Sequence, residues 1–551
     1  MIIAFFSLVL SVTAQVAPGK YFVEFTDKNN NPYSIDRPWE FLSQRALDRR
    51  AAQGIAITET DLPVTPSYVE GVAAIGAWPM VRVKWLNGLI FACSDPSLIP
   101  LIEALPYVQK VVKSSLVKQP VPGKFDLSVQ ATEPVQGSPE NNLKNTLSYD
   151  YGQSFNQIAM LNGDKLHEEG YRGQGKVIAV LDAGFEGTNT IRTFDSLRDN
   201  GQILGSRDFV SPGGTVYGHH PHGTMVLSTM GANLPGELIG TAPKADYWLL
   251  RTEDGGSEYI IEEYNWVAGA AFADSVGADI INSSLGYTEF DDPSQNHTCD
   301  DMTGNTTPVT RGANIAAQRG MVVVNSAGNS GGSGWMCVGA PADGTDVLAV
   351  AAVDSNGNYA SFSSWGLING SYVKPNVASQ GALAVVSWTD GTIVRSNGTS
   401  FSSPIMAGMV ASLWSARPGL SASDLRRMVE QSGSQSGNPD TLLGYGIPDF
   451  FLILGEQEQG AQKAAGAKVF PNPFSRTVTL VLTTGQEASL VAVLWSVRGE
   501  KVFTSAPLAC MQGQNRFELA LPGNLNKGLY LLQIYSPADG STVSTVKIEK
   551  R

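Results

Sequence analysis

The chain has 551 residues, too many for a single hydrophobic core, and typical domain sizes predict roughly three or four structural units. Its 38 Lys and Arg residues are outnumbered by 51 Asp and Glu residues, which gives a formal net charge of −13. This excess of negative charge argues against a general surface for nucleic acid, because phosphate backbones attract cationic proteins. We therefore expect no nucleic-acid partner.

The N-terminus is predicted to be a signal peptide, residues 1–14. An apolar run over 2–10 is followed by the small residues Val12, Thr13 and Ala14, which suit cleavage after Ala14. No Lys or Arg precedes the run, so a partly buried first strand is the alternative. No other stretch approaches the roughly 20 apolar residues of a membrane helix, so we expect an exported protein without a transmembrane segment.

Residues 15–114 are predicted to form a small α+β domain followed by a Pro-rich linker, 115–148. The order of strand-like and helix-like stretches is β-α-β-β-α-β, which is typical of a ferredoxin-like domain. The predicted strands cover 21–25, 81–85, 89–92 and 108–112, and the helices cover 38–53 and 96–105. Its place between a signal peptide and a larger exported unit favours a pro-segment over a free-standing binding domain.

Residues 149–455 are predicted to form an α/β domain with a parallel sheet. Continuous apolar runs, which are typical of strands buried on both faces, alternate with helical stretches such as 258–276 and 310–319. The runs cover 177–181, 247–250, 279–282, 321–324 and 347–350. Ligands of such sheets bind at the carboxyl ends of the strands.

A polar linker over 456–467 separates this domain from a predicted all-β sandwich, residues 468–551. Short strands over 477–482, 490–495, 515–519, 529–534 and 544–548 alternate with turn residues. The four cysteines are sparse and show no CxxC spacing. Cys299 and Cys337 fall in the same central region and are a candidate disulfide in an oxidising compartment.

Ser400 is a candidate nucleophile. It follows Gly398 in a tight turn that runs into an almost wholly apolar helix, and Pro404 suits the first turn of that helix. A serine there meets free backbone N–H groups and the positive end of the helix dipole. A plain helix N-cap is the alternative for this stretch alone.

Two further segments supply the partners of Ser400. Asp182 ends a buried strand, and His222 opens a helix of small residues. The segments Asp182-Ala183-Gly184, His222-Gly223-Thr224 and Gly398-Thr399-Ser400-Phe401-Ser402-Ser403-Pro404, in this Asp-His-Ser order, resemble the signature segments of the subtilisin-like serine proteases (subtilases, peptidase family S8). Ser326-Ala327-Gly328-Asn329 is similar to that family's oxyanion-hole segment, and Asn282-Ser283-Ser284-Leu285-Gly286 is similar to its substrate-binding strand end.

The resemblance implies a secreted serine endopeptidase that acts through an acyl-enzyme and needs no cofactor for catalysis. Asp182 would orient His222, and His222 would take the proton of Ser400. The Asn329 side chain and the Ser400 backbone N–H would form the oxyanion hole. Protein or peptide substrates would bind as an added strand, and the implied substrate-binding residues are Ser284, Leu285, Gly286, Ala327 and Gly328.

Two alternatives to this interpretation involve the same residues, and structural calcium is a separate question. An inactive scaffold or adhesin would show a changed residue among the catalytic four, and none is changed. His219, His220 and His222 could hold zinc, but no HExxH spacing supports it. The family often binds structural calcium, and weak candidates are Asp291, Asp292, Asp300 and Asp301, for which a solvated acidic loop is the favoured interpretation.

The two ends of the chain also resemble parts of exported subtilases. Residues 15–148 resemble the family's pro-segment, an intramolecular inhibitor that is cut away. The C-terminal sandwich, with Val469 to Phe474, Gly528 to Leu532 and a basic tail, resembles the sorting domain of the bacterial type IX secretion system. This implies secretion machinery as a partner and export through the periplasm and outer membrane of a Gram-negative bacterium, to the surface or beyond. A carbohydrate-binding module is the alternative for this domain.

Overall fold

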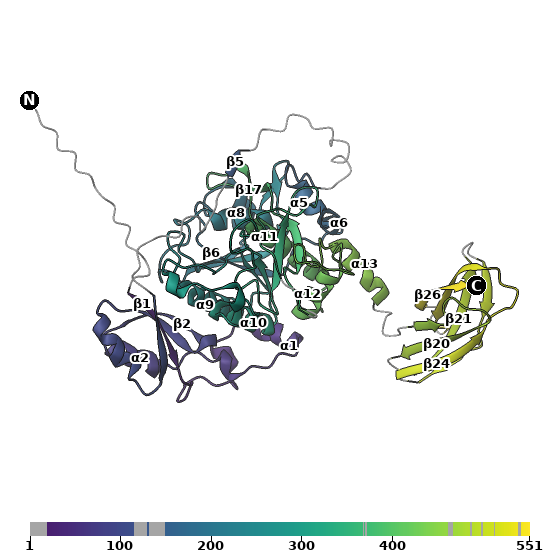
Figure 1. Ribbon diagram of the computed structural model, residues 1–551, viewed down its shortest axis with the longest axis horizontal. Coiled ribbons are helices and arrows are strands. Elements are labelled where there is room, and N and C mark those ends of the chain that lie inside the picture. The colour runs from purple at the N-terminus through teal and green to yellow at the C-terminus, as the bar shows by residue number, and fades with distance from the viewer. Residues whose placement is uncertain are drawn as a thin grey trace, which may run out of the picture. The chain divides into compact units, whose positions relative to one another are not determined.

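A computed structural model describes most of the chain. It covers residues 19–114, 129–131, 149–366, 368–369, 372–460, 467–484, 487–496, 500–511, 513–537 and 542–551. The predicted signal peptide and most of the predicted linker 115–148 lie outside these residues. The chain divides into two compact units, Met1–Phe451 and Leu452–Arg551 (Figure 1).

A seven-stranded parallel sheet forms the centre of the first unit. Its order is β16 (Val377–Gln380), β13 (Leu348–Val353), β12 (Val322–Ser326), β11 (Ile280–Ser283), β6 (Val177–Asp182), β10 (Asp246–Arg251) and β7 (Ile203–Asp208). The sheet confirms the predicted α/β class, and five strands lie where apolar runs predicted them. The two edge strands were not predicted, because β7 alternates with exposed residues and β16 is short and half polar.

Helices cover both faces of this sheet. Helices α8 (His222–Gly231) and α11 (Thr399–Ala416) pack against each other, and α9 (Ile261–Val276) packs against α10 (Pro308–Gln318). The central strands β6, β11, β12 and β13 are therefore buried along their whole length. Shorter helices are α5 (Phe155–Ala159), α6 (Gly163–Glu168), α7 (Asp195–Asp199), α12 (Ala422–Gln431) and α13 (Phe450–Gly460).

The N-terminal α+β domain is a four-stranded antiparallel sheet of ferredoxin-like order. The order is β2 (Trp78–Val83), β3 (Gly88–Ala92), β1 (Lys20–Phe25) and β4 (Val108–Lys113). Helices α2 (Pro66–Ala74) and α3 (Ile99–Glu103) share a hydrophobic core with the sheet. The sequence prediction was wrong about the first of these helices. The predicted helix 38–53 is reduced to α1 (Gln44–Ala52), and α2 was overlooked because it is short, begins with a proline and contains Gly71.

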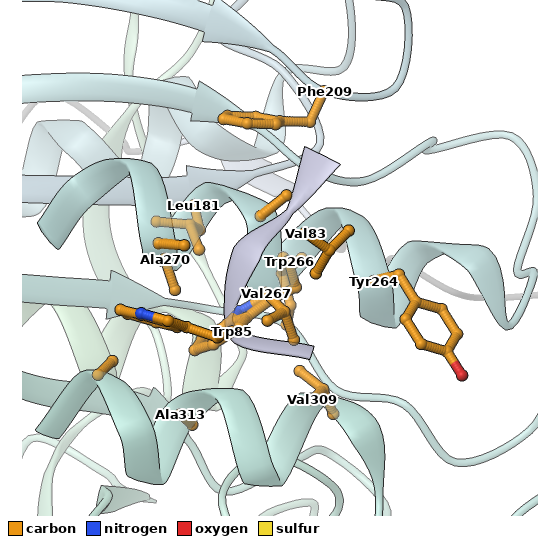
Figure 2. Packing of buried hydrophobic residues seen from close by; sticks show 14 of the residues in the cluster. Val83, Trp85, Leu181, Phe209, Tyr264, Trp266, Val267, Ala270, Val309 and Ala313 are labelled. Carbon is orange, nitrogen blue, oxygen red and sulfur yellow. The ribbon is translucent and has the colours of Figure 1, made fainter. Parts of the chain in front are cut away.

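The other face of this sheet packs against the larger domain. Val83 and Trp85 lie in one hydrophobic cluster with Trp266 and Val267 of α9 and Ala313 of α10, as Figure 2 shows. The rings of Phe22 and Tyr264 stack with their centroids 3.8 Å apart. Apolar burial of this kind stabilises a docked domain by about 1.5–3 kcal/mol for each fully buried large side chain.

A buried ionic network surrounds this apolar contact. Asp274 of α9 is fully buried and accepts hydrogen bonds from Arg49 at 2.5 Å and from Arg50 at 2.7 Å, with Lys84 at 3.5 Å. Arg50 also contacts Asp61 of its own domain at 2.9 Å. Burial opposes the ionisation of Asp274, but Lys84, Arg49 and Arg50 together hold the pKa of this carboxyl below its usual value. The docked domain is therefore matched to the larger one in charge as well as in shape.

Two segments predicted as linkers contain regular structure. Residues Val129–Ala131 form β5, which pairs antiparallel with β18 (Ile393–Ser396), and β18 pairs with β17 (Ala384–Ser387). Helix α13 extends to Gly460, so residues 456–460 of the second predicted linker are helical. Two further hairpins are β8 (Asn233–Leu234) with β9 (Leu238–Ile239) and β14 (Ile368–Asn369) with β15 (Tyr372–Val373).

Beyond α13, the second unit is the predicted all-β region. One sheet holds β19 (Ala467–Phe470), β20 (Thr477–Thr484) and β24 (Gly513–Ala520). The other holds β22 (Lys501–Thr504), β21 (Ala488–Ser496), β25 (Gly528–Tyr535) and β26 (Thr542–Lys550), with β23 (Leu508–Cys510) beside β21. A shared hydrophobic core fills the domain. Among the residues described here, the aromatics Trp495, Phe503, Phe517, Tyr530 and Tyr535 are buried or half-buried, which disfavours a carbohydrate-binding row.

Helices long and apolar enough to cross a membrane do not occur in the described parts of the chain.

Asp274→Asn should weaken docking of the N-terminal domain. Losing one charge of a buried ionic group leaves Arg49 and Lys84 without their anion and Arg50 with Asp61 alone, so the free energy of unfolding should fall by about 3–5 kcal/mol. Denaturant unfolding of the full chain, with Ser400→Ala in both proteins to prevent autolysis, measures this loss. Glu40→Gln, in an exposed pair with Arg37, is the control and should cost at most about 1 kcal/mol.

The lowered pKa of Asp274 also predicts how the stability difference between these two proteins depends on pH. Because the folded pKa of Asp274 lies below its usual value, its stabilisation is present above that usual value and is lost as the pH falls through the folded pKa. The difference in stability between the protein with Asp274 intact and the Asp274→Asn variant should therefore be constant near neutral pH and should close in acid. A difference that grows on acidification would contradict the ionic role of Asp274.

Candidate active site

Asp182 and His222 meet at the carboxyl end of the sheet. Asp182 is the last residue of β6, and His222 is the first residue of α8. His222 Nδ1 lies 2.8 Å from Asp182 Oδ1, and both side chains are almost fully buried. Asp182 Oδ1 also accepts the Ala183 backbone N–H at 2.8 Å. A buried carboxylate in this position fixes the orientation of the imidazole and favours the tautomer with its proton on Nδ1.

A glycine lets α8 start this close to β6. The Gly223 N–H donates to the Gly184 carbonyl at 3.0 Å, and a Cβ on Gly223 would lie only 2.3 Å from that oxygen. Any larger residue at 223 would push His222 away from Asp182. The glycine after His222 is thus a steric requirement of the contact.

Ser400 lies in the first turn of α11, beside the same pair. Its neighbour Phe401 has its ring centroid 6.4 Å from that of His222, so the N-terminus of α11 faces the imidazole. Ser400 is partly exposed, whereas the helix from Phe401 to Trp414 is buried. The helix N-cap is Gly398, so the alternative interpretation of Ser400 as an N-cap is wrong.

Pro404 does not lie in the first turn of α11, as the sequence suggested, but is its sixth residue. A proline there cannot donate the i→i−4 hydrogen bond, and the carbonyl left without this donor is that of Ser400. The Ser284 hydroxyl supplies the missing donor, with Oγ 2.8 Å from the Ser400 carbonyl oxygen. Ser284, predicted as a substrate-binding residue, therefore uses its side chain to hold the backbone of Ser400.

The amide of Asn329 is held by Thr399, which the sequence reasoning did not single out. Asn329 Oδ1 accepts the Thr399 backbone N–H and hydroxyl, each at 2.9 Å, which leaves Nδ2 as the outward donor. A Cβ on Gly398 would lie 3.6 Å from both the Cβ and the N of Ser400 and 3.7 Å from Asn329 Nδ2. The amide nitrogen and Ser400 thus flank one small space. The position of Thr399 directly before the nucleophile was the signal that could have identified it.

The predicted substrate segments follow neighbouring strands. Ser284, Leu285 and Gly286 come after β11, and Ala327 and Gly328 come after β12, with which β11 pairs in parallel. Gly286 is exposed and Gly328 is half-buried, whereas the other three are buried. Gly328 has φ +108°, a conformation that favours glycine. Exposed backbone at two adjacent strand ends suits an extended peptide.

The three clustered histidines point to different partners. His219 Nε2 lies 3.7 Å from Asp208, His220 Nδ1 accepts the His222 backbone N–H at 3.3 Å, and His222 binds Asp182. Among the residues that the structure describes, the only group placed to hold a metal ion is Glu253, Glu258 and Glu262. The zinc alternative therefore has no geometric support in this part of the chain.

Helix-capping aspartates and a disulfide shape the loop that carries the calcium candidates. Asp292 accepts the Ser294 N–H at 3.0 Å, and Asp301 accepts the Thr298 N–H at 2.7 Å. Asp291 is buried, and Asp300 is exposed. Cys299 and Cys337 form the expected disulfide, with their Cα atoms 6.1 Å apart. The disulfide joins the loop after β11 to the loop after β12, and so braces the two substrate segments.

Comparisons with known proteins agree with this geometry. Residues 173–446 match the subtilase family, residues 20–126 match a peptidase S8 propeptide domain of Bacteroidota, and residues 468–549 match a secretion system C-terminal sorting domain. The chain is 31% identical to subtilisin DY of Bacillus licheniformis over 284 residues, which are 51% of this chain and 92% of that protein. It is 31% identical to subtilisin E of Bacillus subtilis over 297 residues, 53% and 69% of the two chains, and 29% identical to thermitase of Thermoactinomyces vulgaris over 274 residues, 49% and 85%.

These matches define the class as a serine endopeptidase that is made with a propeptide. The chain belongs to the subtilase family. Its N-terminal α+β domain is the propeptide domain, called the pro-domain below, and its C-terminal β region is a sorting domain.

Ser284→Ala should destabilise the first turn of α11. The Ser400 carbonyl would lose the donor that replaces the absent Pro404 N–H, so the free energy of unfolding should fall by about 1–3 kcal/mol. Because the acceptor is a backbone atom, the measurement works in a Ser400→Ala background. The control is Ser333→Ala, whose exposed hydroxyl donates to the Ser330 carbonyl and accepts the Trp335 N–H, both within the same loop. Equal stability of the two variants would exclude this role of Ser284.

Proposed function

We propose that this chain is an exported zymogen whose Asp182, His222 and Ser400 hydrolyse peptide bonds through an acyl-enzyme. The supporting observation is the buried 2.8 Å contact between Asp182 and His222 beside the first turn of α11, in which Ser400 is partly exposed. A serine hydroxyl is a weak nucleophile until a base removes its proton, and His222 is the base in reach of this turn. The inactive-scaffold alternative gains no support, because all four residues needed for catalysis are present.

The proposed reaction has two steps. Ser400 Oγ attacks the substrate carbonyl carbon while His222 Nε2 accepts its proton, and His222 then protonates the departing amine as the C–N bond breaks. Water attacks the acyl-enzyme in the same way and regenerates Ser400. Asp182 remains ionised throughout and stabilises the imidazolium, which is the role a buried carboxylate on Nδ1 can perform.

Two donors are proposed to stabilise the tetrahedral oxyanion. They are Asn329 Nδ2 and the Ser400 backbone N–H, which flank the space over Gly398. The Thr399 contacts fix Asn329 before substrate arrives, so little reorganisation is needed when negative charge develops. The peptide substrate would add a strand along Ser284 to Gly286, with a side chain entering beside Ala327 and Gly328.

The flanking domains are proposed to control where and when this site acts. The last strand of the pro-domain sheet, β4, contacts the loop that follows the substrate segment, where Gln295 donates to the Lys113 carbonyl at 2.8 Å. The pro-domain would act as an intramolecular inhibitor until it is cut away. The sorting domain supports export by type IX secretion machinery, from the periplasm across the outer membrane of a Gram-negative bacterium.

Ser400→Ala should abolish both peptide hydrolysis and release of the pro-domain. The substitution removes the attacking oxygen, so the purified protein should keep its pro-domain, whereas the unaltered chain should yield a mature enzyme that begins within residues 115–150. N-terminal sequencing and a casein-digestion assay measure the two outcomes. Normal processing of the variant when purified alone would contradict self-cleavage, and residual hydrolysis would contradict the nucleophile.

Asn329→Ala should slow turnover with little effect on KM. The lost donor binds the oxyanion rather than the ground-state peptide, so the loss should fall on kcat. A fall of about 10²–10³-fold is expected, a magnitude carried over from the corresponding donor of subtilisin itself. Steady-state kinetics on a peptide anilide measure it, and an unchanged kcat would exclude Asn329 from the oxyanion hole.

A further inference from the structure

A buried arginine ends the strand next to the one that carries Asp182. In the parallel register, Arg251 of β10 pairs with Asp182 of β6 on one side and with Asp208 of β7 on the other. Register partners project from the same face of the sheet, and neighbouring strands lie about 4.8 Å apart. Arg251 is 3% exposed and Asp208 is 2% exposed. The guanidinium group is therefore enclosed between the ends of two strands that finish in aspartates.

Two consecutive carbonyl groups at the end of β6 are held by β10. The Asp182 carbonyl accepts the Thr252 N–H at 3.1 Å. The next carbonyl, that of Ala183, accepts the Nε–H of Arg251 at 3.0 Å. The first donor is a backbone group that almost any residue would supply, whereas the second depends on the identity of residue 251. Arg251 thus fixes the turn after β6 through its side chain.

This turn supplies the backbone donor of the Asp182 carboxylate. Asp182 Oδ1 accepts the Ala183 N–H at 2.8 Å and lies 2.8 Å from His222 Nδ1. The other oxygen, Oδ2, is buried and has no hydrogen-bond partner among the described residues. One backbone N–H therefore orients the carboxylate toward the imidazole. Ala183 is held through both of its backbone polar groups, by Asp182 at the N–H and by Arg251 at the carbonyl.

A buried carboxylate holds the guanidinium group in place. Arg251 Nη1 donates to Asp208 Oδ2 at 3.0 Å, and Nη2 lies 3.6 Å from Asp254 Oδ1. Asp208 Oδ1 accepts the backbone N–H groups of Val210 and Ser211, each at 2.8 Å. A buried ion pair is tolerated when further hydrogen bonds satisfy its remaining atoms. Asp208 therefore compensates the charge of Arg251 and fixes the direction of its side chain.

Arginine suits this position better than lysine does. The guanidinium group is a rigid planar fork of N–H donors, so Nε can donate to the Ala183 carbonyl while Nη1 donates to Asp208. A lysine carries the same charge on a single nitrogen at the end of a flexible stem. It could remain near Asp208, but it would not also hold the carbonyl in this geometry. Exchanging arginine for lysine at 251 therefore removes the contact with the turn and keeps the charge.

We infer that Arg251 is a positioning residue for peptide hydrolysis, because it holds Ala183 so that the Asp182 carboxylate stays aligned with His222. The inference rests on the function proposed above for Asp182 and His222. Arg251 contacts the turn and Asp208 rather than the reacting atoms, so it acts through Asp182. An aligned carboxylate stabilises the imidazolium that forms in the transition state. Loss of the alignment should therefore lower turnover and leave substrate binding unchanged.

Arg251→Lys tests the inference with the charge retained. An added cysteine protease, which is then inhibited, removes the pro-domain from every protein compared, so that self-processing does not affect the result. On a peptide anilide, kcat should fall about 10²-fold, the loss expected from a displacement of about 1 Å, while KM changes less than about twofold. The control is Arg198→Lys on α7, whose guanidinium likewise donates to two carbonyls, those of Thr188 at 2.7 Å and Ile191 at 2.8 Å. Its kcat should equal that of the unaltered enzyme.

A second substitution shows whether Arg251 acts through Asp182. In the residual activity of an Asp182→Asn enzyme, adding Arg251→Lys should lower kcat by less than about twofold, because the carboxylate to be aligned is already gone. A further fall as large as the one in the unaltered background would overturn the inference. An unchanged kcat in Arg251→Lys, or a loss confined to KM, would overturn it as well.

Asp208→Asn decides the question if Arg251→Lys does not fold. The substitution removes the charge that anchors the guanidinium group and keeps a side chain of similar shape. We expect kcat to fall at least about tenfold with KM unchanged. A kcat equal to that of the unaltered enzyme would overturn the inference. Absence of hydrolysis by the unaltered enzyme is a separate outcome, which would contradict the proposed function and the inference with it.

Discussion

Hydroxyl groups hold the N-terminus of α11 against the ends of β11 and β12, and the geometry of the site depends on this attachment. Ser284 binds the Ser400 carbonyl, and Thr399 binds Asn329. Further along, Ser403 donates to Asn282 at 2.8 Å. The rest of the helix is apolar and buried in the sheet's core, where packing resists displacement. Polar contacts therefore set the position of Ser400, while apolar packing supplies the rigidity.

Pro404 determines which donor the Ser400 carbonyl pairs with. With a different residue at 404, the backbone N–H of that residue would donate to the Ser400 carbonyl inside the helix. The carbonyl would then have no need of a donor from the substrate segment. The proline removes that internal bond, so the carbonyl pairs with Ser284, which lies two residues before Gly286. The nucleophile and the strand that would bind the peptide are thus linked through one hydrogen bond. A sequence rule that treats proline only as a helix terminator misses this.

The pro-domain docks on the same elements that lead into the site. Its Arg49, Arg50 and Lys84 surround Asp274 near the end of α9, and α9 leads into β11 and the substrate segment that follows it. The docked pro-domain buries the Asp274 carboxylate, which would be exposed to water if the two domains separated. The contact therefore depends on both partners being correctly folded, because each ion is tolerated in the interior only with its counterion.

The class of fold could be predicted from the sequence, and the candidate site residues could be proposed from it, because both depend on local signals. Apolar runs identified five of the seven parallel strands, and the segments around Asp182, His222 and Ser400 supplied the candidate site residues. Contacts between segments far apart in the sequence could not be predicted from these local signals. Arg49 and Arg50 are typical of a solvated helix face, yet they are buried because Asp274 lies opposite them. The pairing of β5 with β18 and the extension of α13 to Gly460 also depend on structure that composition does not encode.

Covalent labelling tests most directly whether Asp182, His222 and Ser400 act as one unit. A phosphonylating reagent reacts with a serine hydroxyl that a neighbouring base has activated, and mass spectrometry of the digested mature enzyme locates the adduct. The adduct should form on Ser400 in the unaltered enzyme and should be undetectable in His222→Ala from which an added protease has removed the pro-domain. An adduct on another serine, or labelling of Ser400 at an unchanged rate in His222→Ala, would contradict the triad.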